Sequence, residues 1–220
     1  MKILAIDSAS DVCSVALLDN DNLIDEINLE NGRTHSENLM PLVDEIIKRN
    51  NMDIKDIELL GCTVGPGSFT GIRIGVASIK PIAEVLNIKV ASVTSLEVLS
   101  KNVDDESNRV CLIDARNNQV YFGAFDKDSN LIMEYAADDI NAVLEQIKLD
   151  NITFVGNGAE LHKDLIKAKF PNAKFSDNNK QSAKNVGFMT YKKYLENKLE
   201  NADTIIPIYL RKSQAERLKK

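Results

Sequence analysis

Short blocks of apolar residues separated by polar turns occupy the first thirty positions of the chain. Lys2 to Ile6, Val12 to Leu18 and Leu23 to Leu29 each have the length and composition of a strand. The polar run Asp19-Asn20-Asp21-Asn22, between the last two blocks, is typical of a reversal. The pattern therefore predicts a meander of three strands at the start of the chain.

A helix is predicted next, because apolar residues recur at positions i, i+3, i+4, i+7 and i+8. These residues are Leu39, Leu42, Val43, Ile46 and Ile47. Thr34 and Glu37 have the spacing of a capping box, which would start the helix at Thr34 and leave Pro41 inside it. Asn38 is the alternative start, and it would move the proline closer to the first turn, where a missing amide costs less.

Apolar blocks and amphipathic segments alternate through the rest of the chain. We expect strands over residues 59–64, 88–93, 110–113, 120–125, 131–135 and 153–155. We expect helices over residues 139–148, 160–169 and 182–197, and one long helix between the first two of these strands. The polar segment Lys101–Arg109 is predicted to link two lobes.

Two parts of the chain resemble each other. The segments ILAIDSASDVCSVALLDNDNLIDE and VCLIDARNNQVYFGAFDKDSNLIMEY each carry Ile-Asp at the end of a strand, then a polar turn, a strand and a reversal. Asp7 precedes Asp19 by 12 positions, and Asp114 precedes Asp126 by 12 positions. An internal repeat in the sequence indicates that the fold is built from repeated structural units. Here it predicts the α/β plan of the actin, Hsp70 and sugar-kinase group, in which two duplicated lobes bind nucleotide between them.

The lobes follow from this repeat and from the polar link. We expect an N-terminal lobe over residues 1–103, a C-terminal lobe over residues 104–205 and a basic tail over residues 206–220. The tail could pack back on the N-terminal lobe.

The stretch GPGSFTGIRIGVASIKPIAEVL, residues 65–86, predicts a glycine-rich turn and a helix that is apolar on two sides. One side carries Phe69, Ile72, Val76, Ile79, Ala83 and Leu86. The other carries Gly71, Ile74, Gly75, Ser78, Ile82 and Val85. The first side can pack on a sheet, whereas the second needs another cover. Pro81 is predicted to kink or end the helix.

We interpret the second side as an interface with another subunit, since its small residues would let a second helix approach closely. The alternative cover is the other lobe of the same chain. The candidate interface residues are Phe69, Thr70, Gly71, Ile74, Gly75, Ser78, Ile82 and Val85.

The composition excludes several classes of protein. The net charge is -6 and the pI is about 5.1, so nucleic acid would be contacted locally or through a partner. The tail YLRKSQAERLKK is basic and could touch the phosphates of a nucleic acid, although a solvated terminal helix is the commoner explanation. The three cysteines are far apart, which favours reduced thiols and a cytoplasmic protein. The sequence predicts no signal peptide and no membrane helix.

The sequence offers little for catalysis. The only histidines are His35 and His162, which have no HxxxH spacing. We expect His35 to start a helix and His162 to be solvated on a helix surface. The turn GPGSFTG does not match the P-loop pattern.

Weak residual nucleotide binding is the remaining possibility for a cofactor. Asp7, Ser8, Ser10 and Asp114 are the candidate nucleotide or phosphate residues, because they lie at the turns that hold phosphate in actin-like ATPases. Neither turn contains glycine, and we favour turn capping for both aspartates. We therefore expect no metal and no cofactor.

The segments IDSAS, GRTHSENLMPLVDEII, GPGSFTGIRIG, IDARNNQVYFGAF and PIYLRKSQAE, in this order, resemble the TsaB (YeaZ) family. The likeness spans nearly the whole chain, and GPGSFTGIRIG is its most specific part. It implies an actin-like ATPase (ASKHA, RNase H-like) fold and an accessory role in making threonylcarbamoyladenosine on tRNA beside the anticodon. It also implies assembly with a TsaD-like catalytic paralog, a TsaE-like ATPase and tRNA through the complex, a homodimer in isolation, and an interface on the helix after GPGSFTG.

The sequence departs from the family pattern in two places. The first strand ends in IDSA where IDTS is usual, and Pro81 stands where glycine is usual. The metal-binding HxEGH segment of the catalytic paralog aligns with Ser95–Leu99, which puts Ser95 and Leu99 at its histidine positions. We therefore favour a scaffold without catalytic groups over an actin-like ATPase, a metallopeptidase-like enzyme or a self-associating module without a tRNA role.

Overall fold

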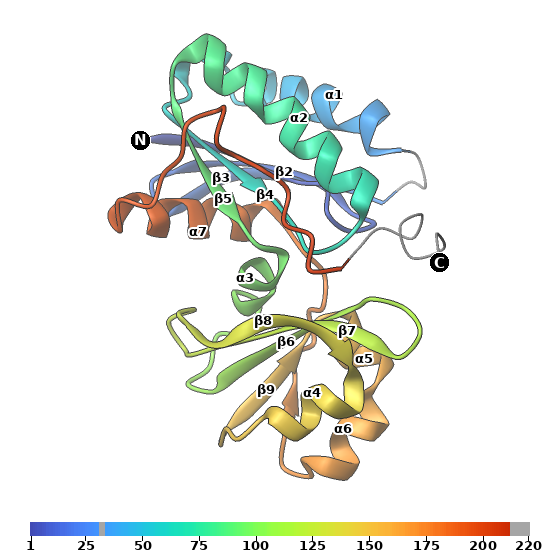
Figure 1. Cartoon of the computed structure of the whole chain (residues 1–220). Coiled ribbons are helices and arrows are strands. Elements are labelled where there is room, and N and C mark those ends of the chain that lie inside the picture. The colour runs from blue at the N-terminus through green and yellow to red at the C-terminus, as the bar shows by residue number, and fades with distance from the viewer. Residues whose placement is uncertain (31–33, 212–220) are drawn as a thin grey trace. The chain divides into compact units, whose positions relative to one another are not determined.

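The computed structural model describes residues 1–30 and 34–211 of the chain, which divides into two compact units (Figure 1). The first unit comprises Met1–Val98 and Gln181–Ile208. The second comprises Leu99–Lys180 and residues 209–211. The first unit is therefore assembled from two segments that lie far apart in the sequence.

A five-stranded sheet forms the centre of the first unit, in the order β3-β2-β1-β4-β5. Strand β1 pairs antiparallel with β2 and parallel with β4, and β4 pairs parallel with β5. The strands are β1 (Lys2–Asp7), β2 (Cys13–Asp19), β3 (Asn22–Leu29), β4 (Leu59–Thr63) and β5 (Lys89–Val93). The predicted meander at the start of the chain is confirmed as β1, β2 and β3.

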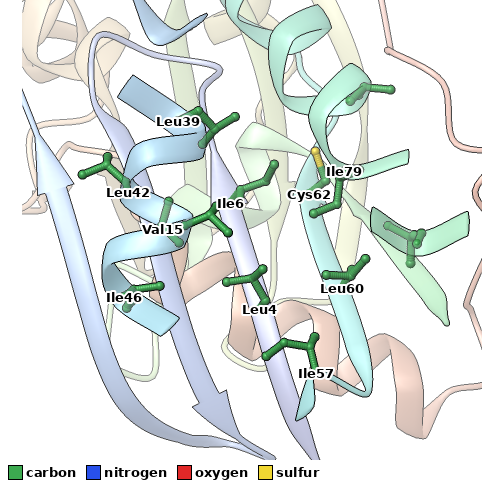
Figure 2. Close-up of a cluster of buried hydrophobic side chains, with 14 of the residues drawn as sticks. Leu4, Ile6, Val15, Leu39, Leu42, Ile46, Ile57, Leu60, Cys62 and Ile79 are labelled. Atoms are coloured by element: carbon green, nitrogen blue, oxygen red, sulfur yellow. The ribbon is translucent and has the colours of Figure 1, made fainter. Parts of the chain in front are cut away.

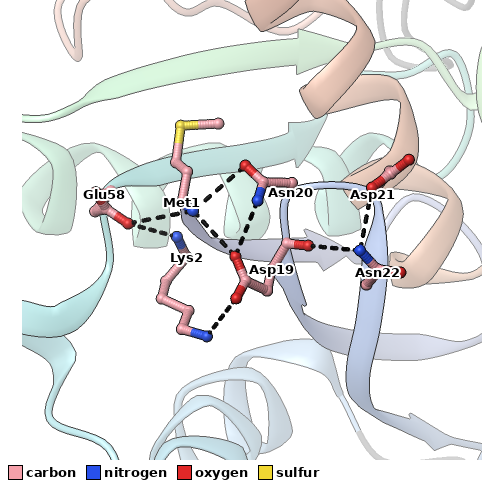
Figure 3. Close-up of polar contacts among 7 residues, drawn as sticks. All are labelled: Met1, Lys2, Asp19, Asn20, Asp21, Asn22 and Glu58. Carbon is pink, nitrogen blue, oxygen red and sulfur yellow. Dashed lines mark hydrogen bonds and ion pairs between the residues drawn. The ribbon is translucent and has the colours of Figure 1, made fainter.

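Charged groups fix the reversal between β2 and β3 (Figure 3). Asp19 accepts hydrogen bonds from the N-terminal ammonium of Met1 over 3.0 Å and from the Lys2 ammonium over 2.9 Å. These two cations hold the pKa of the Asp19 carboxyl below its usual value. Asn20 adopts a left-handed φ of 55°, which asparagine tolerates better than most residues.

Helices cover both faces of the first sheet. On one face lie α1 (His35–Arg49) and α2 (Phe69–Leu86), and on the other lies α7 (Ala183–Leu195). Figure 2 shows Leu39, Leu42 and Ile46 of α1 against Ile6 and Val15 of the sheet. Fully burying one such side chain contributes about 1.5–3 kcal/mol, so this layer accounts for much of the stability of the unit.

The second unit repeats the sheet of the first. Its strand order is β10-β9-β6-β7-β8, with β6 antiparallel to β7 and parallel to β9. The strands are β6 (Asn108–Asp114), β7 (Gln119–Phe125), β8 (Leu131–Asp139), β9 (Ile152–Val155) and β10 (Lys174–Phe175). The helices are α4 (Ile140–Gln146), α5 (Asn157–Leu161) and α6 (Lys163–Lys169).

The two sheets share one topology. In each, three antiparallel strands come first, and two parallel strands then extend the sheet beyond the first strand, in the orders β3-β2-β1-β4-β5 and β8-β7-β6-β9-β10. A helix connects the third strand to the fourth in both units, α1 in one and α4 in the other. The predicted duplication of a strand-rich unit is therefore present in the fold.

The division of the chain differs from the expected lobes over 1–103 and 104–205. Helix α7 was expected in the second lobe, but Ala183, Val186 and Met189 pack with Ile3, Ala5 and other residues of the first sheet. The sequence could not predict this, because the apolar residues of a helix show that one face is buried but not which sheet buries it. Of the tail over 206–220, Ile208 donates its amide to the Val64 carbonyl of the first unit, and residues 212–220 lie outside the described residues.

Several local predictions need correction. The predicted helix over 160–169 is two short helices that meet at His162, whose φ of -104° and ψ of 21° interrupt the helical path. Helix α1 begins after Thr34 and not at Asn38, and the Thr34 side chain makes no capping hydrogen bond. The sequence missed the 3-10 turn η1 (Ile54–Asp56), helix α3 (Ser95–Ser100) and the short strand β10, each too short for a periodic signal.

Candidate functional site

Helix α2 is positioned at both ends by specific caps. Ser68 is the N-cap, and its hydroxyl accepts a hydrogen bond from the Gly71 amide over 3.2 Å. Asn87 ends the helix in a left-handed conformation, with φ 53° and ψ 45°. Pro81 lies inside the helix, which continues through Leu86, so of the predicted kink or end, the end is wrong and the kink stays a prediction.

The small residues of α2 do not face outward as the sequence suggested. A Cβ atom added to Gly71 would lie 1.9 Å from the backbone oxygen of Ser8, and one added to Gly75 would lie 2.6 Å from the Ser8 hydroxyl. The Ser8 hydroxyl also donates to the Gly71 carbonyl over 2.9 Å. Gly71 and Gly75 are therefore buried because they let α2 approach the turn after β1, and not because they offer a bare surface to another subunit.

The outward face of α2 is apolar at its edges and at its end. Val85 is 83% exposed and Phe69 is 38% exposed. Thr70 is exposed, and Ile74, Ser78 and Ile82 are half-buried. Ile74 and Ile82 also touch the core of the first unit. Six of the eight candidate interface residues therefore keep surface available for contact, and these are Phe69, Thr70, Ile74, Ser78, Ile82 and Val85.

Phe69 lies in the first turn of α2, beside a cation. The Arg73 guanidinium lies over the Phe69 ring, 3.8 Å from its centroid. Such a contact holds the ring and the charge together at the surface. The first turn of α2 thus presents an apolar ring with a positive charge beside it.

An extended segment after α7 covers one flank of α2 (Figure 1). Glu200 and Val90 exchange two backbone hydrogen bonds of 2.8 and 3.0 Å. The Lys80 ammonium donates to the Asp203 carbonyl over 3.4 Å, and Ile205 is fully buried in the core. The chain itself therefore covers one flank of α2, and only its outward face remains.

Asp7 ends strand β1 in a buried position. Its Oδ1 accepts the Ala9 amide over 2.8 Å, while Oδ2 has no hydrogen-bond partner among the described residues. Burial raises the pKa of Asp7 to about 6, against the opposing effects of the Ala9 amide and the Thr63 side chain. A buried carboxyl with one unpartnered oxygen is ionised less readily, unless a cation or a hydrogen-bond donor contacts that oxygen.

The two serines near Asp7 form hydrogen bonds within the chain. The Ser8 hydroxyl bonds the Gly71 carbonyl, and the Ser10 hydroxyl accepts the Val12 amide over 3.3 Å. The Ala9 carbonyl accepts the Ser68 amide over 2.8 Å, and a Cβ added to Gly67 would lie 2.3 Å from that oxygen. The turn after β1 is thus packed tightly against the start of α2.

The corresponding turn in the second unit has the same cap. Asp114 accepts the Arg116 amide on Oδ1 over 2.8 Å, as Asp7 accepts the amide two residues on. Arg116, Asn117 and Asn118 all have left-handed φ values, of 63°, 56° and 56°. Both aspartates therefore cap their turns, which is the interpretation that the sequence favoured.

The remaining candidates for chemistry are dispersed. Over residues 1–30 and 34–211, no group of three or more histidine, cysteine, aspartate or glutamate side chains could hold a metal. Ser95 and Leu99 are buried. His35 begins α1, as expected, and its Nε2 lies 2.7 Å from the Ser10 carbonyl. His162 is half-buried and its Nε2 is buried, so the side chain is solvated only in part.

The burial of the thiols limits their reactivity, and the composition of the helices limits which of them could cross a membrane. Cys13, Cys62 and Cys111 are buried and free, and burial raises the pKa of Cys13 to about 11. They are therefore unreactive as thiolates near neutral pH. In the described part of the chain, every helix is too short or too polar to cross a bilayer.

Comparisons with known proteins extend the local picture to the whole chain. A family model described as "TsaD: tRNA N6-adenosine threonylcarbamoyltransferase" matches residues 27–219. The "tRNA threonylcarbamoyladenosine biosynthesis protein TsaB" of Bacillus subtilis is 32% identical over 98% of this chain and 96% of its own length. The protein of the same name from Haemophilus influenzae is 29% identical over 96% of this chain and 94% of its own length.

Solved structures agree on the fold. A crystal structure from Pseudomonas aeruginosa, of a protein with similarity to peptidase YEAZ, has a TM-score of 0.82 at 21% identity and covers 96% of this chain and 99% of its own. An activator of 2-hydroxyisocaproyl-CoA dehydratase from Clostridium difficile, with bound ADPNP, has a TM-score of 0.51 at 9% identity over 95% and 100%. A ROK family protein from Streptococcus pneumoniae has a TM-score of 0.52 at 11% identity, and the match covers 90% of this chain and 99% of that one. The chain has the actin-like ATPase fold.

Proposed function

Since this chain belongs to the TsaB (YeaZ) family, we propose that it is a non-catalytic subunit required for the threonylcarbamoyladenosine modification of tRNA. Its relatives are named for the biosynthesis of that nucleoside. The family model that it matches is described as the transferase itself, which supports a catalytic paralog of the same family as its partner. A TsaD-like paralog is therefore the partner of this proposal.

The outward face of α2 is the observation that carries the proposal. Val85, at 83% exposure, and Phe69, at 38%, lie on the same helix as the half-buried Ile74 and Ile82. Apolar groups that stay in contact with water gain about 25 cal/mol for each Å² that a partner covers. Aromatic and aliphatic residues on one helix are also the usual anchors of a helix-mediated interface.

The same face serves two assemblies in this proposal. In isolation, two copies of the chain cover each other's α2 faces in a homodimer. In the presence of the TsaD-like paralog, which shares the fold, the heterodimer replaces the homodimer. A TsaE-like ATPase then joins the heterodimer, and tRNA meets the chain through the complex.

The dispersed side chains support a role without catalysis. The positions that align with a metal-binding segment are Ser95 and Leu99, which are buried and cannot replace two imidazoles. The hydroxyls of Ser8 and Ser10 form hydrogen bonds within the chain. The proposal includes no metal and no cofactor, although Asp7 leaves weak nucleotide binding open to test.

Charge on the exposed end of α2 tests the proposal. Val85→Glu should abolish both homodimer formation in size-exclusion chromatography and capture of the TsaD-like paralog in a pull-down. Val85 contributes little to the core, so the circular dichroism spectrum and the melting temperature should not change. The modified nucleoside, measured by mass spectrometry of tRNA digests, should disappear from cells that carry only this variant.

The matched control is Leu195→Glu. Leu195 is the last residue of α7, is 62% exposed and lies on the opposite face of the first sheet. It should assemble and support modification like the unchanged chain. Equal assembly by the Val85 and Leu195 variants would contradict the assignment of the interface, and normal nucleoside levels after depletion of the protein would contradict the function.

A further inference from the structure

Three aromatic rings form a cluster in the second unit. Phe154 is fully buried in β9 and stacks on Phe175 of β10, with ring centroids 5.8 Å apart and an interplanar angle of 25°. Phe170, after α6, also packs on Phe154, with ring centroids 5.7 Å apart. Phe175 therefore packs against the core of the second unit from the edge strand β10.

Two lysines of α6 lie over the outer ring of this cluster. The Lys163 ammonium lies 5.2 Å from the Phe175 centroid, and the Lys167 ammonium lies 5.9 Å from it. Both side chains are exposed, and the described residues include no carboxylate within 4 Å of either. Lys174, by contrast, is neutralised by Asp105 at 3.0 Å.

The arrangement places two like charges over one ring, and no carboxylate of the described residues lies within 4 Å of either charge. Like charges four residues apart on a helix repel each other, and attraction to the face of one ring offsets part of that cost. The ring also restricts the two long side chains, so an anion that binds them has less side-chain entropy to remove. The site is therefore prepared for a ligand with negative charge.

We propose that Lys163 and Lys167 form a contact for the phosphodiester backbone of tRNA. The proposal rests on the proposed function, which brings tRNA to the complex. Because the whole chain has a net charge of -6, RNA would avoid most of its surface, and a local pair of fixed ammonium groups is the kind of contact that remains. The pair reads no sequence and would position the tRNA on the complex.

Neutral substitutions separate this contact from the fold. The test variant is Lys163→Gln with Lys167→Gln, and the matched control is Lys55→Gln with Lys148→Gln. Lys55 and Lys148 are also exposed lysines with no carboxylate within 4 Å among the described residues, so the two double variants change the net charge equally. Each variant is assembled with the TsaD-like paralog, and binding of fluorescently labelled tRNA is measured by anisotropy at several salt concentrations.

The test variant should bind tRNA roughly threefold or more weakly than the control at low salt, because each lost ammonium removes one phosphate contact. The slope of log affinity against log salt should become shallower by about 1.4–1.8, as expected for two contacts. Phe175→Leu keeps both charges and should therefore keep the slope, with a smaller loss of affinity.

The outcomes separate this inference from the function on which it rests. Equal tRNA affinity and equal salt slopes for the two double variants, in complexes that assemble normally, would overturn the lysine contact and leave the scaffold role intact. Failure of the unchanged chain to join the TsaD-like paralog would overturn the scaffold role instead. A test variant that loses affinity for the paralog, and not for tRNA, would show that the lysine pair binds an acidic protein surface and would also overturn the proposal.

Discussion

The hydroxyl of Ser8 donates a hydrogen bond of 2.9 Å to the carbonyl oxygen of Gly71. This bond joins the turn after β1 to the first turn of α2, two parts of the chain more than sixty residues apart. It also explains why a glycine follows Thr70, since any side chain at that position would collide with the backbone of Ser8. The orientation of the α2 face is therefore set by the turn that would hold phosphate in a nucleotide-binding relative.

Gly71→Ala should destabilise the first unit more than Gly75→Ala does. Alanine is the better helix former by about 1 kcal/mol, but its Cβ at position 71 would lie 1.9 Å from the Ser8 backbone oxygen. At position 75 the nearest atom is the Ser8 hydroxyl, at 2.6 Å. Urea denaturation should give a loss of about 1–3 kcal/mol for Gly71→Ala. In a Ser8→Ala background, the loss of unfolding free energy caused by Gly75→Ala should become smaller, because the hydroxyl is gone, while the loss caused by Gly71→Ala should not change. A larger loss for Gly75→Ala than for Gly71→Ala would contradict this prediction.

Ile74→Ala and Val85→Ala should separate stability from assembly. Ile74 is half-buried and packs on the core, so its truncation should lower both the free energy of unfolding and the affinity for a partner. Val85 is almost fully exposed, so its truncation should change the unfolding energy by less than about 0.5 kcal/mol and still weaken association. Denaturation and analytical ultracentrifugation of the same samples measure both quantities. A large loss of stability for Val85→Ala would mean that the residue is covered within its own subunit.

Asp7 should make the protein less stable as the pH rises from about 4 to about 6. Its folded-state pKa is about 6, above the usual 3.8, so over this range the folded state holds a proton that the unfolded state releases. The stabilisation is complete below pH 4 and is lost as the pH rises through the folded-state pKa. Asp7→Asn keeps the Oδ1 acceptor for Ala9 and removes the titration, so it should be more stable than the wild type by up to about 3 kcal/mol at pH 7. Parallel stability curves for the two proteins from pH 4 to 8 would contradict the assignment.

Magnesium and ATP should leave the melting temperature of the protein unchanged. A ligand that binds only the folded state raises the melting temperature, and the rise grows with the ratio of ligand concentration to Kd. The serines beside Asp7 already form hydrogen bonds within the chain. Thermal shift with wild type and Asp7→Asn is the measurement. A rise that appears in the wild type and vanishes in Asp7→Asn would establish a nucleotide site, and phosphate release in the same samples would support the enzyme alternative.

Lys193→Met should cost more stability than Lys48→Met. The Lys193 ammonium lies 2.9 Å from Glu97 and also donates to the Ser92 carbonyl, and both charged side chains are largely buried. Lys48 pairs with Asp44 at 2.7 Å on an exposed helix surface. Removal of the partly buried partner should cost about 1–3 kcal/mol, whereas removal of the exposed one should cost less than about 0.5 kcal/mol. Equal losses in urea denaturation would show that burial does not distinguish the two pairs.

The strands and their repetition were predictable because they depend on local pattern. The Ile-Asp turns at Asp7 and Asp114, with equal spacing to the next reversal, foretold two sheets of one topology. The actin-like fold followed from that repeat together with the resemblance. Periodicity also found helix α2 and its outward residue Val85.

Long-range contacts were not predictable from periodicity. The wheel of α2 placed Gly71 and Gly75 beside Ile74, but only the fold shows that Ser8 occupies the space that these glycines leave. The destination of α7 was missed for the same reason. The lysines over Phe175 were also missed, since the ring and α6 meet only when β10 adds to the sheet.

The first unit contains Met1–Val98 and Gln181–Ile208, which has a consequence for its synthesis. When the ribosome has made the first 98 residues, Ile3, Ala5 and Leu18 still lack the helix that covers them. At the usual elongation rate, roughly 4–17 s pass before the missing segment is translated. During that interval the nascent chain exposes one apolar face of a sheet, which makes it a substrate for chaperones, and truncation before α7 should yield an aggregating product even though the first five strands are complete.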